Sequence, residues 1–237
     1  MFDFHGKFTD RMLLPEGAAG FHPISYVSRL YVPPAPTAWR LRIKRGFDIA
    51  MSLLALIVLA PVLLGIWLAI RRDSPGPGLF LQQRIGQDGQ PFGLWKFRTM
   101  RHTPIMEELR QATRDDPRVT RLGAWLRRTS LDELPQCWNV LQGQMSIVGP
   151  RPHAPGTRAG GRLFEDVAPH YAERHRVKPG MTGLAQMRGW RGETDTEQKL
   201  LGRLTSDLEY IDNWSFHLDL SIILRTIPVM ARMLNAY

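Results

Sequence analysis

The feature that most constrains this chain is an apolar run at residues 49–70, IAMSLLALIVLAPVLLGIWLAI. Ser52 is its only polar side chain, and the run is long enough for a helix that enters a membrane. A helix buried in a protein core is the alternative. Because few soluble folds accommodate such a segment, the run predicts a membrane-associated protein.

Two details leave the path of this segment open. Pro61 lies near its middle, where proline kinks or breaks a helix, and each half alone is then too short to cross about 30 Å of hydrocarbon. Basic residues flank both ends, at 42–45 and 71–72, and such clusters favour the cytoplasmic side. A kinked span places the clusters on opposite sides, whereas a helix-break-helix hairpin keeps them on one side. The residues alone support both.

The rest of the chain is organised around this segment. Residues 1–40 hold five prolines and no sustained periodicity, which predicts a flexible N-terminal arm without a cleavable signal peptide. Residues 79–98 hold two short apolar runs around Gly-Gln-Asp-Gly, which predicts a β-hairpin. Apolar spacings of three and four predict helices at 105–114, 133–142 and 197–211. The fold is therefore expected to be mainly α with a small β-hairpin.

The C-terminal residues 217–237 are apolar but contain Arg225, Arg232 and a proline at position 228, which is expected to break them. A helix in the plane of the lipid headgroups and a helix that closes the core both fit this pattern.

Charge narrows the class of partner. The net charge is +9, of which residues 41–72 carry +4 and residues 96–128 carry +5. This concentration predicts a polyanionic partner. Aromatic residues do not alternate with the basic ones as a nucleic-acid stacking platform requires, so no nucleic acid is expected. A single cysteine excludes an intramolecular disulfide framework and a cysteine-rich zinc site, and no Rossmann or P-loop motif is present.

The densest group of reactive side chains is the stretch 126–136, LRRTSLDELPQ. Its structural interpretation is a capping box, with Ser130 at the N-cap of a helix and Glu133 three residues later. Its functional interpretation uses the same geometry, because a helix start with Arg127 nearby attracts phosphate. There Asp132 is expected to have a lowered pKa and to stay ionised, as a nucleophile that forms an acyl phosphate must.

Three further bases are candidates for binding phosphate. Arg151 stands between Pro150 and Pro152, which hold the backbone extended around it. Lys178 begins a similar Lys-Pro-Gly loop, and Lys96 lies at the end of the predicted hairpin. Each of these patterns alone also fits an ordinary turn.

Taken together, the motifs resemble the bacterial sugar transferases, the monotopic polyprenyl-phosphate phosphoglycosyl transferases. The resemblance extends from about residue 41 to the end of the chain. Its matching stretches are KRGFDIA…AP (44–61), QQRIGQDGQPFGLWKFRTM (82–100), DPRVTRLGAWLRRTSLDELPQCWNVLQGQMSIVGPRP (116–152), VKPGMTGLAQ (177–186) and GWRGETDTEQK…DLEYIDNWSFHLDL (189–220).

The resemblance implies a role for each site residue. Asp132 is the expected nucleophile on the β-phosphorus of a UDP-sugar, and Glu133 completes an Asp-Glu dyad that sits with it beside a required Mg²⁺. Arg127 and the 149–152 loop, which carries Arg151 and Pro152, match phosphate-binding positions, as does Lys96. The tail at 189–199 resembles members that transfer glucose 1-phosphate, with galactose 1-phosphate next.

The family also implies an architecture and partners. Residues 41–72 are expected to form a re-entrant membrane hairpin that breaks at Pro61, and residues 73–237 a cytoplasmic catalytic domain with interfacial amphipathic helices. The enzyme would lie at the bacterial inner membrane, use undecaprenyl phosphate as acceptor and release UMP to start an exopolysaccharide or capsule; a homo-oligomer is compatible with this arrangement. The alternative function is a non-catalytic, membrane-anchored basic protein that binds anionic lipid or an assembly partner.

Overall fold

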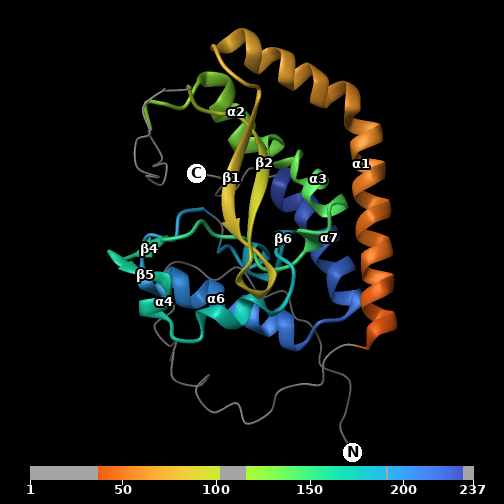
Figure 1. The fold of residues 1–237 in the computed structure, drawn as a ribbon, viewed down its shortest axis with the longest axis vertical. Helices are drawn as coiled ribbons and strands as arrows, with labels where there is room; N and C mark the ends of the chain where they lie inside the picture. Colours follow the sequence, from red (N-terminus) through yellow and green to blue (C-terminus); the bar gives the residue numbers. More distant parts are fainter. Residues whose placement is uncertain (1–36, 102–115, 191, 232–237) are drawn as a thin grey trace, which may run out of the picture. The chain divides into compact units, whose positions relative to one another are not determined.

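The computed structural model describes residues 37–101, 116–190 and 192–231, with side chains of the last helix up to position 226. Figure 1 shows a mainly helical domain with one long two-stranded hairpin. The predicted helix at 105–114 and most of the predicted arm lie outside the described residues. The elements in chain order are α1 (Ala38–Asp73), β1 (Leu79–Ile85), β2 (Pro91–Phe97), α2 (Arg121–Thr129), α3 (Gln136–Leu141), β3 (Ser146–Val148), β4 (Arg158–Ala159), β5 (Arg162–Leu163), α4 (Phe164–Val167), β6 (Gly180–Thr182), α5 (Leu184–Met187), α6 (Glu197–Asp212) and α7 (Phe216–Ala231), with short 3-10 helical turns at Gln87–Gly89 (η2), Leu131–Glu133 (η3) and Tyr171–Arg176 (η4).

The apolar run forms part of α1, a single helix of 36 residues that continues through Pro61. In its most apolar window only 11% of the residues are buried, so α1 is not a core helix. The predicted break at Pro61 is absent, and the helix bends instead of ending (Figure 1). The physical reason is that proline removes one hydrogen bond and displaces one carbonyl, which bends a helix that the neighbouring turns can still hold together.

The two ends of α1 are attached to the domain by different forces. Near its start, Lys44 forms an ion pair with Asp219 of α7 at 2.6 Å, and Asp48 accepts a hydrogen bond from the backbone N–H of Ile147 at 3.1 Å. Near its end, Ile66 and Ile70 pack in a buried cluster with residues of β2 and α2. The basic cluster at 42–45 therefore includes a residue that holds the fold, besides any role in membrane orientation.

The hairpin is confirmed, with β1 and β2 antiparallel and Leu79 opposite Phe97. Its turn has Asp88 at φ 54° and Gly89 at φ 74°, left-handed conformations that aspartate and glycine adopt at low cost. The other edge of β2 is bound by α3, because Asn139 donates to the Gly93 carbonyl at 2.6 Å and accepts from the Trp95 N–H at 2.9 Å. This contact sets α3 beside the hairpin.

Two strands far apart in sequence, β3 and β6, pair in parallel. The pairing continues into the loops that follow, since Gly149 N–H donates to the Thr182 carbonyl and Gly180 N–H to the Pro150 carbonyl, both at 2.9 Å. A Cβ on Gly149 would meet the Lys178 carbonyl at 2.5 Å, so glycine is required for this approach. The 149–152 loop is thereby fixed against the loop that carries Lys178.

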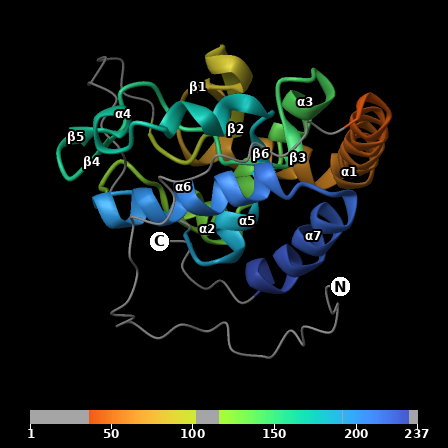
Figure 2. The same ribbon diagram turned by 90° about the horizontal axis from the view of Figure 1, so that it is seen from below.

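The C-terminal helices complete the core. Figure 2 shows α5, α6 and α7 together on one side of β3 and β6. Val148, Tyr210 and Ile222 form the buried cluster between them. The prediction for 197–211 is confirmed by α6, whereas the helix predicted at 133–142 is shorter, at 136–141. The expected break at position 228 is wrong, because α7 remains helical to residue 231, and Ile222 shows that its inner face closes the core.

Candidate active site

The Asp-Glu dyad lies in a tight turn and not at the start of a capped helix. Ser130 has a left-handed backbone (φ 56°) and ends α2, with its N–H bonded to the carbonyls of Leu126 and Arg127. Its side chain makes no capping hydrogen bond, and residues 131–133 form a single 3-10 turn. The capping-box interpretation is therefore wrong, because a capping N-cap residue typically has an extended backbone, whereas that of Ser130 is left-handed.

The Glu133 carboxylate binds two cations. Lys96 Nζ lies 3.1 Å from Oε1, Arg151 Nη1 donates to Oε2 at 3.0 Å, and Arg151 Nη2 also donates to Oε1. Burial raises the pKa of Glu133, but Arg151 and then Lys96 outweigh it and hold this pKa well below its usual range. Glu133 is therefore a permanent anion that joins the hairpin, the dyad turn and the 149–152 loop.

Asp132 has the opposite environment. Its side chain is 8% exposed, and its carboxylate accepts no hydrogen bond within the described part of the chain. Burial, followed by the charge of Glu133, raises the pKa of Asp132 to about 6, although Lys96, Arg127 and Arg151 oppose the shift. The expected lowering of this pKa is wrong, because burial of the turn outweighs the surrounding positive charge. At neutral pH the carboxylate is still mostly ionised, and it remains available for chemistry.

Arg127 joins this site, whereas Lys178 does not. Arg127 Nε donates to Thr99 Oγ1 at 2.8 Å, and its charge acts on Asp132. Lys178 is near Arg45 of α1, whose charge, after burial, lowers the lysine pKa. Of the predicted phosphate-binding residues, the structure thus brings together Lys96, Arg127 and Arg151 around the dyad.

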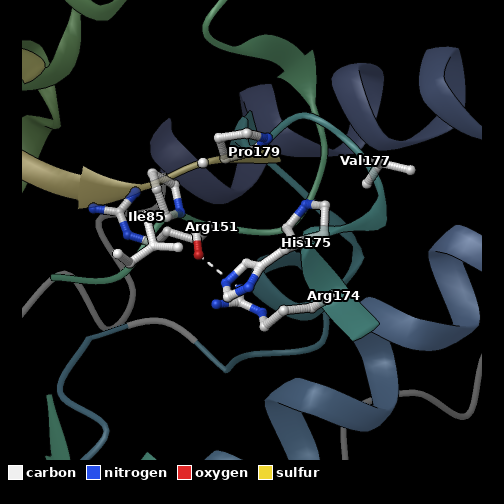
Figure 3. A pocket seen from close by; sticks show the side chains of 9 residues that line it. Ile85, Arg151, Arg174, His175, Val177 and Pro179 are labelled. Atoms are coloured by element: carbon white, nitrogen blue, oxygen red, sulfur yellow. Dashed lines mark hydrogen bonds between the residues drawn. The ribbon is translucent and has the colours of Figure 1, made fainter. Parts of the chain in front are cut away.

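The 149–152 loop rests on a buried charged network that the sequence motifs did not reveal. Arg174 Nη2 donates to the Arg151 carbonyl at 2.7 Å (Figure 3). The same nitrogen forms an ion pair with Asp207 of α6 at the same distance. His153 lies between Arg174 and Arg203, 2.6 Å and 2.9 Å from their Nη1 atoms. Burial, with these two positive charges, holds the pKa of His153 well below its usual range, so the imidazole is neutral.

One sequence signal could have pointed to this network. Arg203 and Asp207 are one helical turn apart on α6, within a face that also carries the buried Leu200, Leu204 and Leu208. Charged residues on a helix face that is otherwise apolar are typical of a buried ion pair.

The hollow beside this network is too small for a substrate. It has a volume of about 10 Å³, room for about one water molecule, and lies between Ile85, Pro152, Arg174 and the 175–179 segment (Figure 3). Pro152, which follows Arg151 in the same loop, is buried here.

The dyad can be tested for its fit to Mg²⁺, which proteins commonly hold with one or two carboxylates and substrate phosphates. Asp132 offers a carboxylate that accepts no hydrogen bond from the described residues, whereas both oxygens of Glu133 are bound by cations. Among the described residues no group of three His, Cys, Asp or Glu side chains could hold a metal alone. The site therefore fits a cation held by Asp132 and by phosphates, and a ligand role for Glu133 stays a prediction.

Comparison with known proteins places these residues in a family context. Residues 39–233 match the family described as bacterial sugar transferase. The chain is 52% identical to an undecaprenyl-phosphate glucose phosphotransferase of Komagataeibacter xylinus, over 84% of this chain and 38% of the relative. It is 53% identical to the exopolysaccharide production protein PSS of Rhizobium leguminosarum bv. phaseoli, over 79% and 94%. It is 50% identical to the UDP-glucose:undecaprenyl-phosphate glucose-1-phosphate transferase of Escherichia coli, over 84% and 42%. The chain thus spans about two fifths of the first and third relatives and nearly all of the second.

Proposed function

The chain belongs to the bacterial sugar transferase family, and we propose that it transfers a sugar 1-phosphate from a UDP-sugar to undecaprenyl phosphate. Glucose is the favoured sugar and galactose the next, because similar proteins are named for glucose 1-phosphate transfer. The similarity to an exopolysaccharide production protein supports a role in starting a lipid-linked glycan.

In the first step, an Asp132 oxygen attacks the β-phosphorus of the UDP-sugar. The bond from that phosphorus to the bridging oxygen breaks, UMP leaves with the electron pair, and an acyl phosphate joins Asp132 to the sugar phosphate. Lys96, Arg127 and Arg151 stabilise the charge that develops on the phosphate oxygens. Burial keeps Asp132 poorly solvated, which favours attack over hydrogen bonding to water.

In the second step, an oxygen of the lipid phosphate attacks the same phosphorus. The acyl phosphate bond breaks, Asp132 returns to its carboxylate form, and the product is a polyprenyl diphosphate sugar. Glu133 orients Lys96 and Arg151 through both steps because its two oxygens bind these cations. Bound Mg²⁺, held by Asp132 and the diphosphate, would neutralise phosphate charge.

The membrane supplies the lipid acceptor. The exposed apolar surface of α1, its bend and the proline within it support a re-entrant segment that keeps both ends on the cytoplasmic face of the inner membrane (Figure 1). The site would then lie at the interface, where a soluble nucleotide sugar and a lipid phosphate can meet.

The observation that carries this proposal is the buried Asp132 carboxylate, which accepts no hydrogen bond from the described residues and is surrounded by three cations. The test is UMP release by the purified protein with Mg²⁺, undecaprenyl phosphate and a panel of UDP-sugars. Wild type is expected to release UMP with UDP-glucose, and Asp132→Asn to lose this release. An Asp132→Asn variant with unimpaired turnover would refute the nucleophile, and a wild type without turnover would favour the non-catalytic alternative.

A further inference from the structure

An apolar groove of about 420 Å³ lies beside the dyad turn and has no role in the steps above. This volume is within the range of sites that bind small molecules. Its walls come from the second half of α1, one face of the hairpin and the start of α3. Its lining includes Leu64 and Trp67 of α1, Trp95 and Phe97 of β2, Pro135, and Trp138 of α3.

We propose that this groove binds the isoprene units nearest the phosphate of the lipid acceptor, which rests on the proposed function. The hairpin separates the apolar chain from the charged head. Side chains alternate along a strand, so Trp95 and Phe97 face the groove, while Lys96 between them faces the other way and contacts Glu133. A phosphate at Lys96 and a chain in the groove lie on the two faces of one strand.

The dyad turn likewise has an apolar side and a charged side. Leu131 packs against the buried cluster that includes Ile66 and Phe97, whereas Asp132 is surrounded by cations. Pro135, three residues after the nucleophile, lines the groove. A lipid whose phosphate reaches Asp132 therefore has this apolar surface within reach of its first isoprene units.

The position and surface of the groove favour an isoprenoid over a phospholipid acyl chain. Pro135 of its lining stands three residues after Asp132, on which three cations act, and a lipid that carries a phosphate at the end of its chain matches an apolar groove beside a cationic site. Three indole rings, of Trp67, Trp95 and Trp138, provide large rigid surfaces for a branched, unsaturated chain. Close packing of Trp67 on Gly78 fixes one of them, since a Cβ on Gly78 would lie 2.5 Å from the ring.

The experiment measures acceptor binding and turnover separately, with the full chain in neutral phospholipid nanodiscs. Trp138→Ala removes a ring that is 50% exposed in the groove, and Trp125→Ala is the matched control, with a ring 44% exposed on α2 outside it. Trp138→Ala is expected to raise both the Kd of radiolabelled undecaprenyl phosphate and the acceptor KM about tenfold. The KM for the UDP-sugar is expected to stay within about twofold.

A second pair of variants keeps the proposal testable if the tryptophan variant does not fold. Leu64→Ala in the groove is expected to weaken acceptor binding about threefold, whereas Ile57→Ala, which is 64% exposed elsewhere on α1, has no such effect. Unchanged acceptor Kd in both groove variants overturns the proposal. So does phosphatidic acid that competes equally well and is equally sensitive to Trp138→Ala. Trp138-dependent binding without any UMP release would leave the groove intact and refute the proposed function.

Discussion

At the scale of single residues, the site separates two adjacent carboxylates by environment. Two cations bind the Glu133 carboxylate, so it stays ionised and is held in place. Asp132, in contrast, is buried without hydrogen bonds from the described residues. The difference assigns the structural role to Glu133 and the chemical role to Asp132. It also means that an ionised Asp132 costs stability, since its folded-state pKa lies above the ordinary value.

Asp132→Asn is therefore expected to stabilise the protein at pH 7 to 8. Ionisation of this buried aspartate opposes folding only above its unfolded pKa of about 4, and asparagine removes that penalty. The free energy of unfolding should rise by about 1 to 3 kcal/mol at pH 8, and the gain should vanish near pH 4. Thermal unfolding of both proteins in detergent at the two pH values measures it. A variant less stable than wild type at pH 8 would contradict this environment for Asp132.

The rate of UMP release in the first step is expected to depend on the same carboxylate. Because the pKa of Asp132 is raised to about 6, the rate should fall as pH drops below about 6. In Glu133→Gln the neighbouring negative charge is gone, so the acid limb should move to lower pH, whereas Glu133→Asp keeps the charge and should keep the limb. Single-turnover UMP release between pH 4.5 and about 8 tests both, and identical profiles for Gln and Asp would refute the coupling.

At the scale of elements, buried polar contacts determine how α1 is attached. Asp219 of α7 binds Lys44 and also accepts a hydrogen bond from Tyr210 Oη at 2.8 Å. Asp219→Ala would leave Lys44 and Tyr210 without this partner, which is expected to cost about 3 to 5 kcal/mol. Asp195→Ala, which breaks the exposed pair with Lys199, is the matched control and should cost less than about 1 kcal/mol. Thermal unfolding in detergent measures both, and equal losses would mean that the Lys44 pair is not structural.

At the scale of the whole molecule, the sequence predicted those features that residues close together in the chain determine. The Gly-Gln-Asp-Gly turn specifies the hairpin, and the apolar spacing of 197–211 specifies α6. The pKa of Asp132 and the ion pairs of Glu133 could not be predicted, because they depend on Lys96 from the hairpin and Arg151 from a distant loop. The Arg174–Asp207 pair is equally non-local, since 33 residues separate the partners. Pro61 shows a further limit: proline predicts a disturbed helix, but the surrounding packing decides whether it ends or bends.

The position of α1 relative to the membrane gives the final prediction. If the bend of α1 returns the helix to the side it entered from, single cysteines at Thr37, just before α1, and at Asp73, its last residue, should react with an impermeant maleimide from the same side of sealed vesicles. The native Cys137 does not interfere, because it is buried and burial raises the pKa of its thiol to about 11. Pro61→Leu restores the missing N–H and is expected to straighten the helix. If the two sites are labelled from opposite sides in the protein that retains Pro61, α1 is a kinked span, and the two basic clusters lie on different faces of the bilayer.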